Sequence, residues 1–160
     1  GTFVADTPPL ASADPFPLGE TRAVLDWRMA LELAAAELAA TRADLLSHEA
    51  LAEAADRFMR PEITGDWPQF RRADAAFHVR LAVASGSDRM VAAMTGVHGE
   101  LNDLFHQVPP PVEARAATAA DHLAVVTAIG KRDPQAAREA MREHCARTER
   151  IVDQLSTSAA

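Results

Sequence analysis

Apolar residues recur three or four positions apart along most of the chain, which is the spacing of one face of an α-helix. These stripes predict helices over residues 20–40, 41–59, 68–85, 88–107, 112–130 and 134–155. Thr41-Arg-Ala-Asp44 has the form of a capping box and predicts the start of the second helix. The stretch RPEITGDWPQ, residues 60–69, predicts a loop. We therefore expect an all-α fold, a bundle of about six helices that is antiparallel where the loops are short.

The ends of the chain do not follow the helical pattern. Residues 1–6 (GTFVAD) are β-prone and are expected to be a strand that belongs to another domain. Residues 7–19 are rich in Pro, Ser and Asp and predict a linker. Residues 20–156 then form the helical domain, and residues 157–160 are expected to be a frayed tail.

Composition limits the classes of partner. The chain has 160 residues and a formal net charge of −7, so the chain is a poor electrostatic partner for DNA, RNA or anionic membranes. Its single cysteine, Cys145, cannot form an intramolecular disulfide, which favours a reducing compartment. No apolar run has membrane-spanning length and no signal peptide is recognisable, so a cytoplasmic location is expected, with no membrane partner.

Four polar residues fall on the inward stripes of three predicted helices. Asp74 and His78 are four residues apart and share one helix face. His122 lies on the face of Val125 and Val126, and His144 lies on the stripe of the last helix. One carboxylate and three imidazoles can form the ligand set of a divalent transition metal. Burying these groups apart from one another costs roughly 1–3 kcal/mol for each unpartnered group, whereas one metal satisfies them all.

Signs of catalysis are few. The sequence has no H-E-x-x-H motif, no glycine-rich phosphate loop and no second carboxylate beside the four residues to act as a general base. His98 and Glu100 are the only loose candidates for acid–base chemistry. A metal-dependent hydrolase or lyase of helical-bundle type stays open as an alternative, as does a metal-free helical interaction module in which the histidines are ordinary core residues.

Several motifs carry a resemblance to a known family. These are Asp74-Ala-Ala-Phe-His78, the following HVRLAVASGSDRM, the segment DHLAVVTAIGKRDPQAAREAMREH and, in the first helix, LDWRMALELAAAELAA. Together they resemble the FCD effector domain of the FadR branch of GntR-type transcription regulators, over about residues 20–155. Residues 1–5 are similar to the last wing strand of the winged-helix domain that precedes this domain in the family.

The resemblance implies a fold, a function and a site. The fold would be an all-α antiparallel bundle of six to seven helices around a central metal and ligand cavity. The chain would be the effector-sensing and dimerisation domain of a DNA-binding regulator, not an enzyme, and would contact DNA only through an N-terminal winged-helix domain absent from this sequence. The family's metal ligands fall on Asp74, His78, His122 and His144, with zinc as the expected metal and Ni, Mn or Fe as other options.

The expected effector is a small carboxylic acid, and the expected assembly is a homodimer that uses the first- and fourth-helix faces. Arg28 matches the family's first-helix arginine, which pairs with the effector, although a surface arginine paired with Asp26 or Glu32 is an equal reading of the sequence. His98, which can line a pocket, and Asn102 complete the predicted ligand-binding residues.

Overall fold

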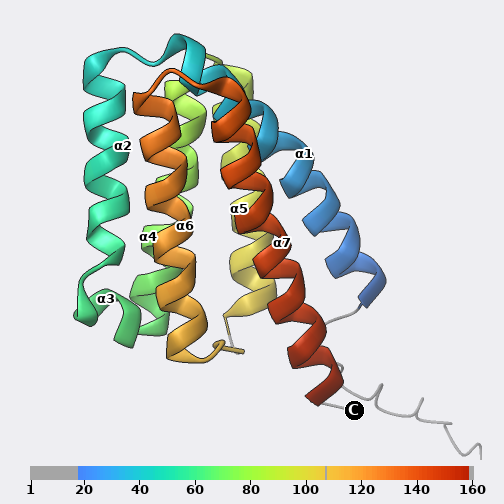
Figure 1. Cartoon of the computed structure of the whole chain (residues 1–160). Coiled ribbons are helices and arrows are strands. Elements are labelled where there is room, and N and C mark those ends of the chain that lie inside the picture. The colour runs from blue at the N-terminus through green and yellow to red at the C-terminus, as the bar shows by residue number, and fades with distance from the viewer. Residues whose placement is uncertain (1–17, 107, 159–160) are drawn as a thin grey trace, which may run out of the picture.

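The computed structural model describes residues 18–106 and 108–158, and every regular element within them is a helix. Figure 1 shows the seven helices: α1 (Leu18–Arg42), α2 (Leu45–Phe58), α3 (Pro61–Gly65), α4 (Trp67–Ala84), α5 (Asp88–Phe105), α6 (Val112–Gly130) and α7 (Pro134–Ser158). The predicted all-α bundle is confirmed. The predicted strand over residues 1–6 and most of the predicted linker lie outside the described residues.

Short connections join the long helices into an antiparallel bundle. Gly86, between α4 and α5, has a φ of +72°, in the left-handed region that favours glycine. Ser87 then caps α5 by accepting a hydrogen bond from the Met90 backbone. Asp133 likewise accepts from the backbone N–H of Ala136 at 2.9 Å at the start of α7. Helix α1 packs against α4, α5, α6 and α7, so its inward face reaches the centre of the molecule.

The core is built from small and large apolar residues in contact. Helix α1 contributes a buried row of alanines, which lets neighbouring helices approach closely: Ala35, Ala36, Ala39 and Ala40. Phe58 and Phe77 are fully buried and pack their rings against His122, at centroid distances of 4.5 and 4.0 Å. The apolar core therefore surrounds a polar centre.

The boundary between α1 and α2 differs from the prediction. The expected capping box put the start of the second helix at Thr41, but α1 continues through Arg42. Asp44 is the N-cap of α2, and its carboxylate accepts a hydrogen bond from the Ser47 backbone at 2.7 Å. The alanine-rich end of α1 and the burial of Ala43 favour continuation of the first helix, which moves the cap by three residues.

The predicted loop over residues 60–69 contains a short helix, α3, so that prediction was wrong in part. Pro61 stands in the first turn, where its missing N–H costs nothing, and Ile63 is buried. Arg115 of α6 donates to the backbone carbonyl of Thr64 at 2.5 Å and so satisfies one of the free acceptors at the end of this helix. Five residues are too few to show a helical period in sequence.

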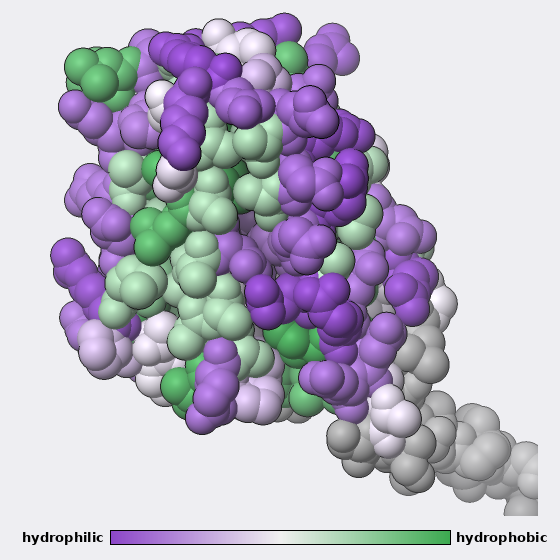
Figure 2. Space-filling model, viewed as in Figure 1, coloured by the Kyte–Doolittle hydropathy of each residue, from purple (hydrophilic) through white to green (hydrophobic). Residues whose placement is uncertain are grey.

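The surface is mainly polar. Figure 2 shows hydrophilic side chains over much of the visible face, with a paler band over α6, whose exposed positions include Ala116, Ala120 and Ala124. None of the helices in the described part of the chain is long and apolar enough to cross a membrane. Helix α7 continues through Ser158, two residues beyond the predicted end of the domain at 156.

Candidate metal centre

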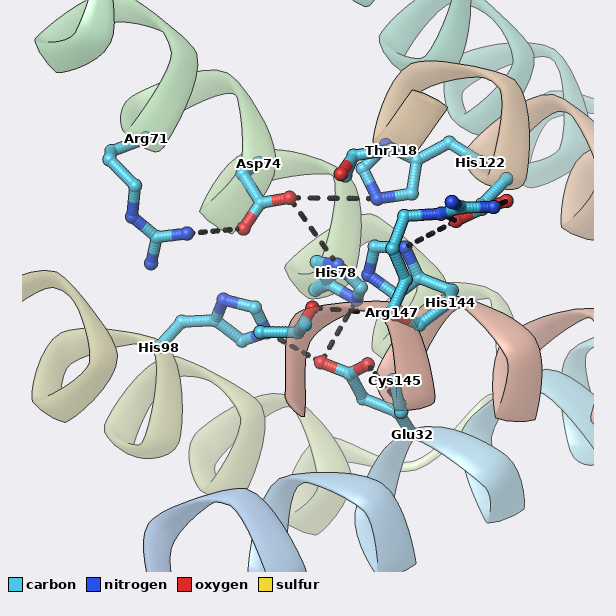
Figure 3. A network of polar contacts seen from close by, with 12 residues as sticks. Glu32, Arg71, Asp74, His78, His98, Thr118, His122, His144, Cys145 and Arg147 are labelled. Atoms are coloured by element: carbon cyan, nitrogen blue, oxygen red, sulfur yellow. Dashed lines mark hydrogen bonds and ion pairs between the residues drawn. The ribbon is translucent and has the colours of Figure 1, made fainter. Parts of the chain in front are cut away.

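The four predicted metal ligands meet at one point inside the bundle (Figure 3). Oδ1 of Asp74 lies 3.7 Å from Nε2 of His78 and 3.6 Å from Nε2 of His122. The rings of His122 and His144 are 4.5 Å apart between centroids. One potential ligand atom from each of the four residues lies within 4.8 Å of the others, and all four residues are buried. Helices α4, α6 and α7 therefore bring three distant segments into one site.

Several ring nitrogens of the buried histidines have no hydrogen-bond partner among the described residues. Both ring nitrogens of His122, Nε2 of His78 and Nδ1 of His144 are inaccessible to solvent and have no hydrogen-bond partner among the described residues. Each such atom costs roughly 1–3 kcal/mol when it stays unpaired. A bound metal ion removes this cost at the nitrogens it coordinates, so the unpaired atoms are direct support for a metal site.

The protonation states also fit a metal. Burial, with help from His78, lowers the pKa of His122 to about 3, and burial with His122 and Arg28 lowers the pKa of His144 well below its ordinary value. Both rings are therefore neutral and can donate a lone pair. Burial would raise the pKa of Asp74, but Arg71 and the nearby histidines hold it well below its ordinary range. An ionised carboxylate and neutral imidazoles are the forms in which these residues bind divalent metals.

Acid is expected to destabilise the protein. The pKa of His122 is lowered to about 3 and that of His98 to about 4, in both cases mainly by burial, against an ordinary value of 6.5. At a pH below 6.5 but above these lowered pKa values, the histidines of the unfolded chain take up protons and those of the folded chain do not. The free energy of unfolding therefore falls as the pH drops below 6.5. We expect a loss of several kcal/mol between pH 7 and pH 4.5 in urea titrations of chelator-treated protein. A curve that is flat over this range would contradict the burial of neutral histidines.

Glu32 of α1 is a central residue that the sequence reasoning missed. It is fully buried, and its Oε1 accepts from Nε of Arg28 at 2.9 Å and lies 2.7 Å from Nε2 of His98 and 3.1 Å from Nδ1 of His78. Its Oε2 accepts from the thiol of Cys145 at 3.3 Å. The expectation that no second carboxylate lies beside the site was therefore wrong. Burial would raise the pKa of Glu32, but Arg28 and the two histidines hold it well below its ordinary value.

Glu32 gives His78 a defined orientation. Nε2 of His78 faces Asp74, while Nδ1 faces Glu32 on the other side of the ring (Figure 3). A carboxylate behind a metal-binding imidazole fixes its tautomer and raises its basicity. Glu32, His78 and His98 also form a second group of potential ligands. The guanidinium of Arg28 bonded to Glu32 disfavours a second cation there.

His144 has a comparable carboxylate nearby. Oδ2 of Asp121 lies 4.0 Å from Nδ1 of His144. Arg147 holds this carboxylate with two hydrogen bonds, of 2.6 Å from Nε and 3.1 Å from Nη2. Asp121 belongs to α6, whereas Arg147 and His144 belong to α7. The Asp121–Arg147 pair therefore links these two helices beside the site.

Arg28 lies directly against the four-residue group. It pairs with Glu32, one of the two partners considered from the sequence, but the pair is buried and not on the surface. Its Nη2 also donates to Nε2 of His144 at 2.6 Å. The pKa of Arg28 is raised despite burial, because Glu32, Cys145 and Asp74 favour its charged form. A permanent positive charge therefore stands beside the predicted metal ligands.

The three residues predicted to bind an effector line two different spaces. Arg28 borders a cavity next to Asp74. His98 and Asn102 instead border an open groove of about 710 Å³ between α4 and α5. Oδ1 of Asn102 is buried and has no hydrogen-bond partner within the described part of the chain, while His98 reaches the centre through Glu32. The structure thus connects His98, but not Asn102, to the four-residue group.

Comparisons with known proteins agree with this architecture. The family model of the FCD domain matches residues 23–147. Among solved structures, the chain is similar to Streptococcus agalactiae GntR, with a TM-score of 0.70 and 23% sequence identity. That match covers 84% of this chain and 61% of the other, so this chain spans less than two thirds of the protein it resembles. None of the curated proteins compared with the chain matches it. The family match covers most of the helical region and all four converging residues, and the chain belongs to the FCD domain family.

Proposed function

We propose that this chain is the effector-sensing and dimerisation domain of a GntR-type transcription regulator, with a metal-containing cavity that binds a small carboxylic acid. The observation that carries the proposal is the meeting of Asp74 with three buried histidines, each of which has at least one ring nitrogen without a hydrogen-bond partner among the described residues, in a chain of the FCD family. Zinc is the expected metal, and nickel, manganese or iron are the other options, because nitrogen and oxygen ligands of this kind accept each of them and availability decides.

Asp74, His78, His122 and His144 would hold the metal. A divalent ion bound by four protein ligands supplies a Lewis acid that can accept a carboxylate oxygen at a remaining coordination position. Arg28 supplies the second attraction, because a guanidinium forms strong charge-assisted hydrogen bonds with carboxylates. The aromatic rings of Phe58 and Phe77 pack against His122 and exclude water from that side of the site.

The site residues explain how an effector would change the rest of a regulator. Arg28 and Glu32 belong to α1, and the metal ligands belong to α4, α6 and α7, so a ligand among them contacts or displaces several helices at once. DNA contact is assigned to a winged-helix domain preceding α1, in agreement with the net charge of −7 on this chain. Homodimerisation follows the same proposal and is tested by sedimentation of the metal-loaded protein.

Glu32 does not support the alternative of a metal-dependent hydrolase. A general base needs a free lone pair within reach of the proton it removes. Oε1 of Glu32 already faces Arg28, His98 and His78, and Oε2 accepts from Cys145. This carboxylate is therefore occupied with holding side chains in place.

A ligand screen tests the proposed function. Zinc-loaded protein is expected to show a raised melting temperature with at least one small carboxylic acid, and the amide of the same acid should have no effect because it lacks the charge. The shift should disappear after chelation and in an Arg28→Met variant. A carboxylate that stabilises chelated and zinc-loaded protein equally would contradict a metal-containing effector site.

A further inference from the structure

A cavity beside Asp74 has two arginines in its wall. Arg28 from α1 and Arg71 from α4 both border it, together with Asp74 and the hydroxyl-bearing residues Thr118 and Thr148. Arg28 is the arginine already assigned to the effector carboxylate. Arg71 has no role in that assignment, although it lies within the same wall.

Two of the three guanidinium nitrogens of Arg71 make no hydrogen bond to the described residues. Its Nη1 donates to Oδ2 of Asp74 at 2.7 Å, on the far side of that carboxylate from the histidines (Figure 3). Its Nε and Nη2 are inaccessible to solvent and have no hydrogen-bond partner among the described residues. These two nitrogens form one edge of the planar guanidinium, the edge that binds a carboxylate through two parallel hydrogen bonds. The unused part of Arg71 thus matches the geometry of one carboxylate.

Aromatic rings hold the Arg71 side chain in place. Its guanidinium carbon lies 5.7 Å from the ring centroid of Trp67 and 5.6 Å from that of Phe105. Trp67 is itself fixed, because its indole N–H donates to the carbonyl of Phe105 at 2.9 Å. Only 12% of the Arg71 side chain is exposed, so the group is preorganised and largely dehydrated.

A divalent metal at the four-residue site would leave the buried groups with an excess of positive charge. Arg28 is balanced by Glu32 and Arg71 is balanced by Asp74. A divalent cation at the four-residue site therefore adds two positive charges with no counter-charge among these groups. Uncompensated charge in the interior is costly, and a dianion removes the imbalance where a monoanion leaves half of it.

We propose that Arg71 binds a second carboxylate of the effector, so that the effector is a small dicarboxylate. This inference rests on the proposed function, in which the metal and Arg28 bind the first carboxylate. The cavity measures about 40 Å³, which is room for only a few water molecules. Entry of a dicarboxylate therefore displaces lining side chains, among which Ile151 and Leu155 on α7 are half-buried.

Calorimetry with matched acids tests the inference on zinc-loaded protein. Succinate and glutarate are compared with butyrate and valerate, which have the same chain lengths and one carboxylate fewer. We expect the dicarboxylates to bind roughly 10- to 100-fold more tightly, the effect of one charge-assisted contact. An Arg71→Met variant should lose this preference, Arg71→Lys should keep part of it, and Arg72→Met, whose side chain is exposed on the neighbouring position, should keep all of it.

The outcomes separate this inference from the proposed function. Equal binding of both series to the wild-type protein overturns the dicarboxylate and leaves the carboxylate site standing. Binding of neither series also overturns the dicarboxylate, whereas the proposed function is overturned only if no carboxylic acid of the wider screen binds. A dicarboxylate preference that survives in Arg71→Met overturns the role of Arg71. Zinc content is measured for each variant because Arg71 also contacts Asp74, and the wild-type comparison decides the ligand class even if Arg71→Met loses the metal.

Discussion

Replacing Glu32 with alanine is expected to lower the free energy of unfolding by about 3–5 kcal/mol, the range found when one partner of a buried ion pair is removed. The carboxylate is fully buried and has Arg28, His98, His78 and Cys145 around it. Its removal leaves the Arg28 guanidinium charged and unpaired in the interior. Glu32→Gln, which keeps the shape but turns an amide N–H toward these donors, should lose less than the alanine variant.

The matched control lies on the same helix. Glu37 of α1 pairs with Arg138 at 3.1 Å, but both side chains are about half exposed, at 50% and 42%. An exposed pair of this kind contributes little, so Glu37→Ala should change the free energy of unfolding by about 0.5 kcal/mol or less. Urea unfolding at pH 7 with a chelator present isolates the effect from metal binding. Losses of equal size in the two alanine variants would contradict the central role of Glu32.

Chelation is expected to lower the melting temperature of zinc-loaded protein by on the order of 10 °C. A ligand that binds only the folded state contributes about 3–4 kcal/mol when its free concentration is 100 to 1,000 times the dissociation constant. For a chain of this size, each kcal/mol corresponds to about 2–4 °C. The buried, unpartnered nitrogens of His78 and His122 make the folded state the one that binds.

Two variants show whether this effect arises at the four-residue site. His122→Asn removes a ligand, so chelation should leave its melting temperature unchanged. His106→Ala removes an exposed histidine outside the site and should respond to the chelator as the wild-type protein does. A chelator response of wild-type size in His122→Asn would contradict the assignment of His122, and no response in the wild-type protein would contradict a stabilising metal.

The four converging residues could be found from sequence because each breaks an otherwise apolar helical stripe. The period places Asp74 and His78 together on α4, but it cannot show that α6 and α7 bring His122 and His144 to the same point. That step depends on the packing of distant helices. The cost of burying four polar groups apart from one another already favoured a shared metal, and the resemblance of the surrounding motifs to the FCD family then pointed to the same four residues.

Glu32 and Arg71 were missed for physical reasons. An acidic residue four positions after an arginine has the same pattern whether the pair is buried or lies on the surface, and the Arg28–Glu32 pair is buried. Arg71 and Arg72 are adjacent and identical in sequence, yet packing against Trp67 and Phe105 buries the first while the second stays exposed. Local periodicity does not carry this information, because tertiary contacts decide which arginine is enclosed.

Side chains from several helices surround the four-residue site and contact its histidines. Asp74 and the three histidines face one another, Glu32 stands behind His78, and Asp121 lies near His144. Helix α1 supplies Glu32 and Arg28 without supplying a ligand of the predicted metal. Its position is therefore coupled to the site through hydrogen bonds, as the proposed sensing function requires.

Metal content measures the central claim most directly. The protein is purified without a histidine tag or metal column, and bound transition metal is determined by elemental analysis for the wild-type chain, for Asp74→Asn and His122→Asn, and for His106→Ala. The proposed site predicts about one equivalent of a divalent transition metal per chain in the wild-type and His106→Ala proteins, and a large loss in the two ligand variants. No metal in the wild-type protein after incubation with zinc, or full occupancy in both ligand variants, would contradict it.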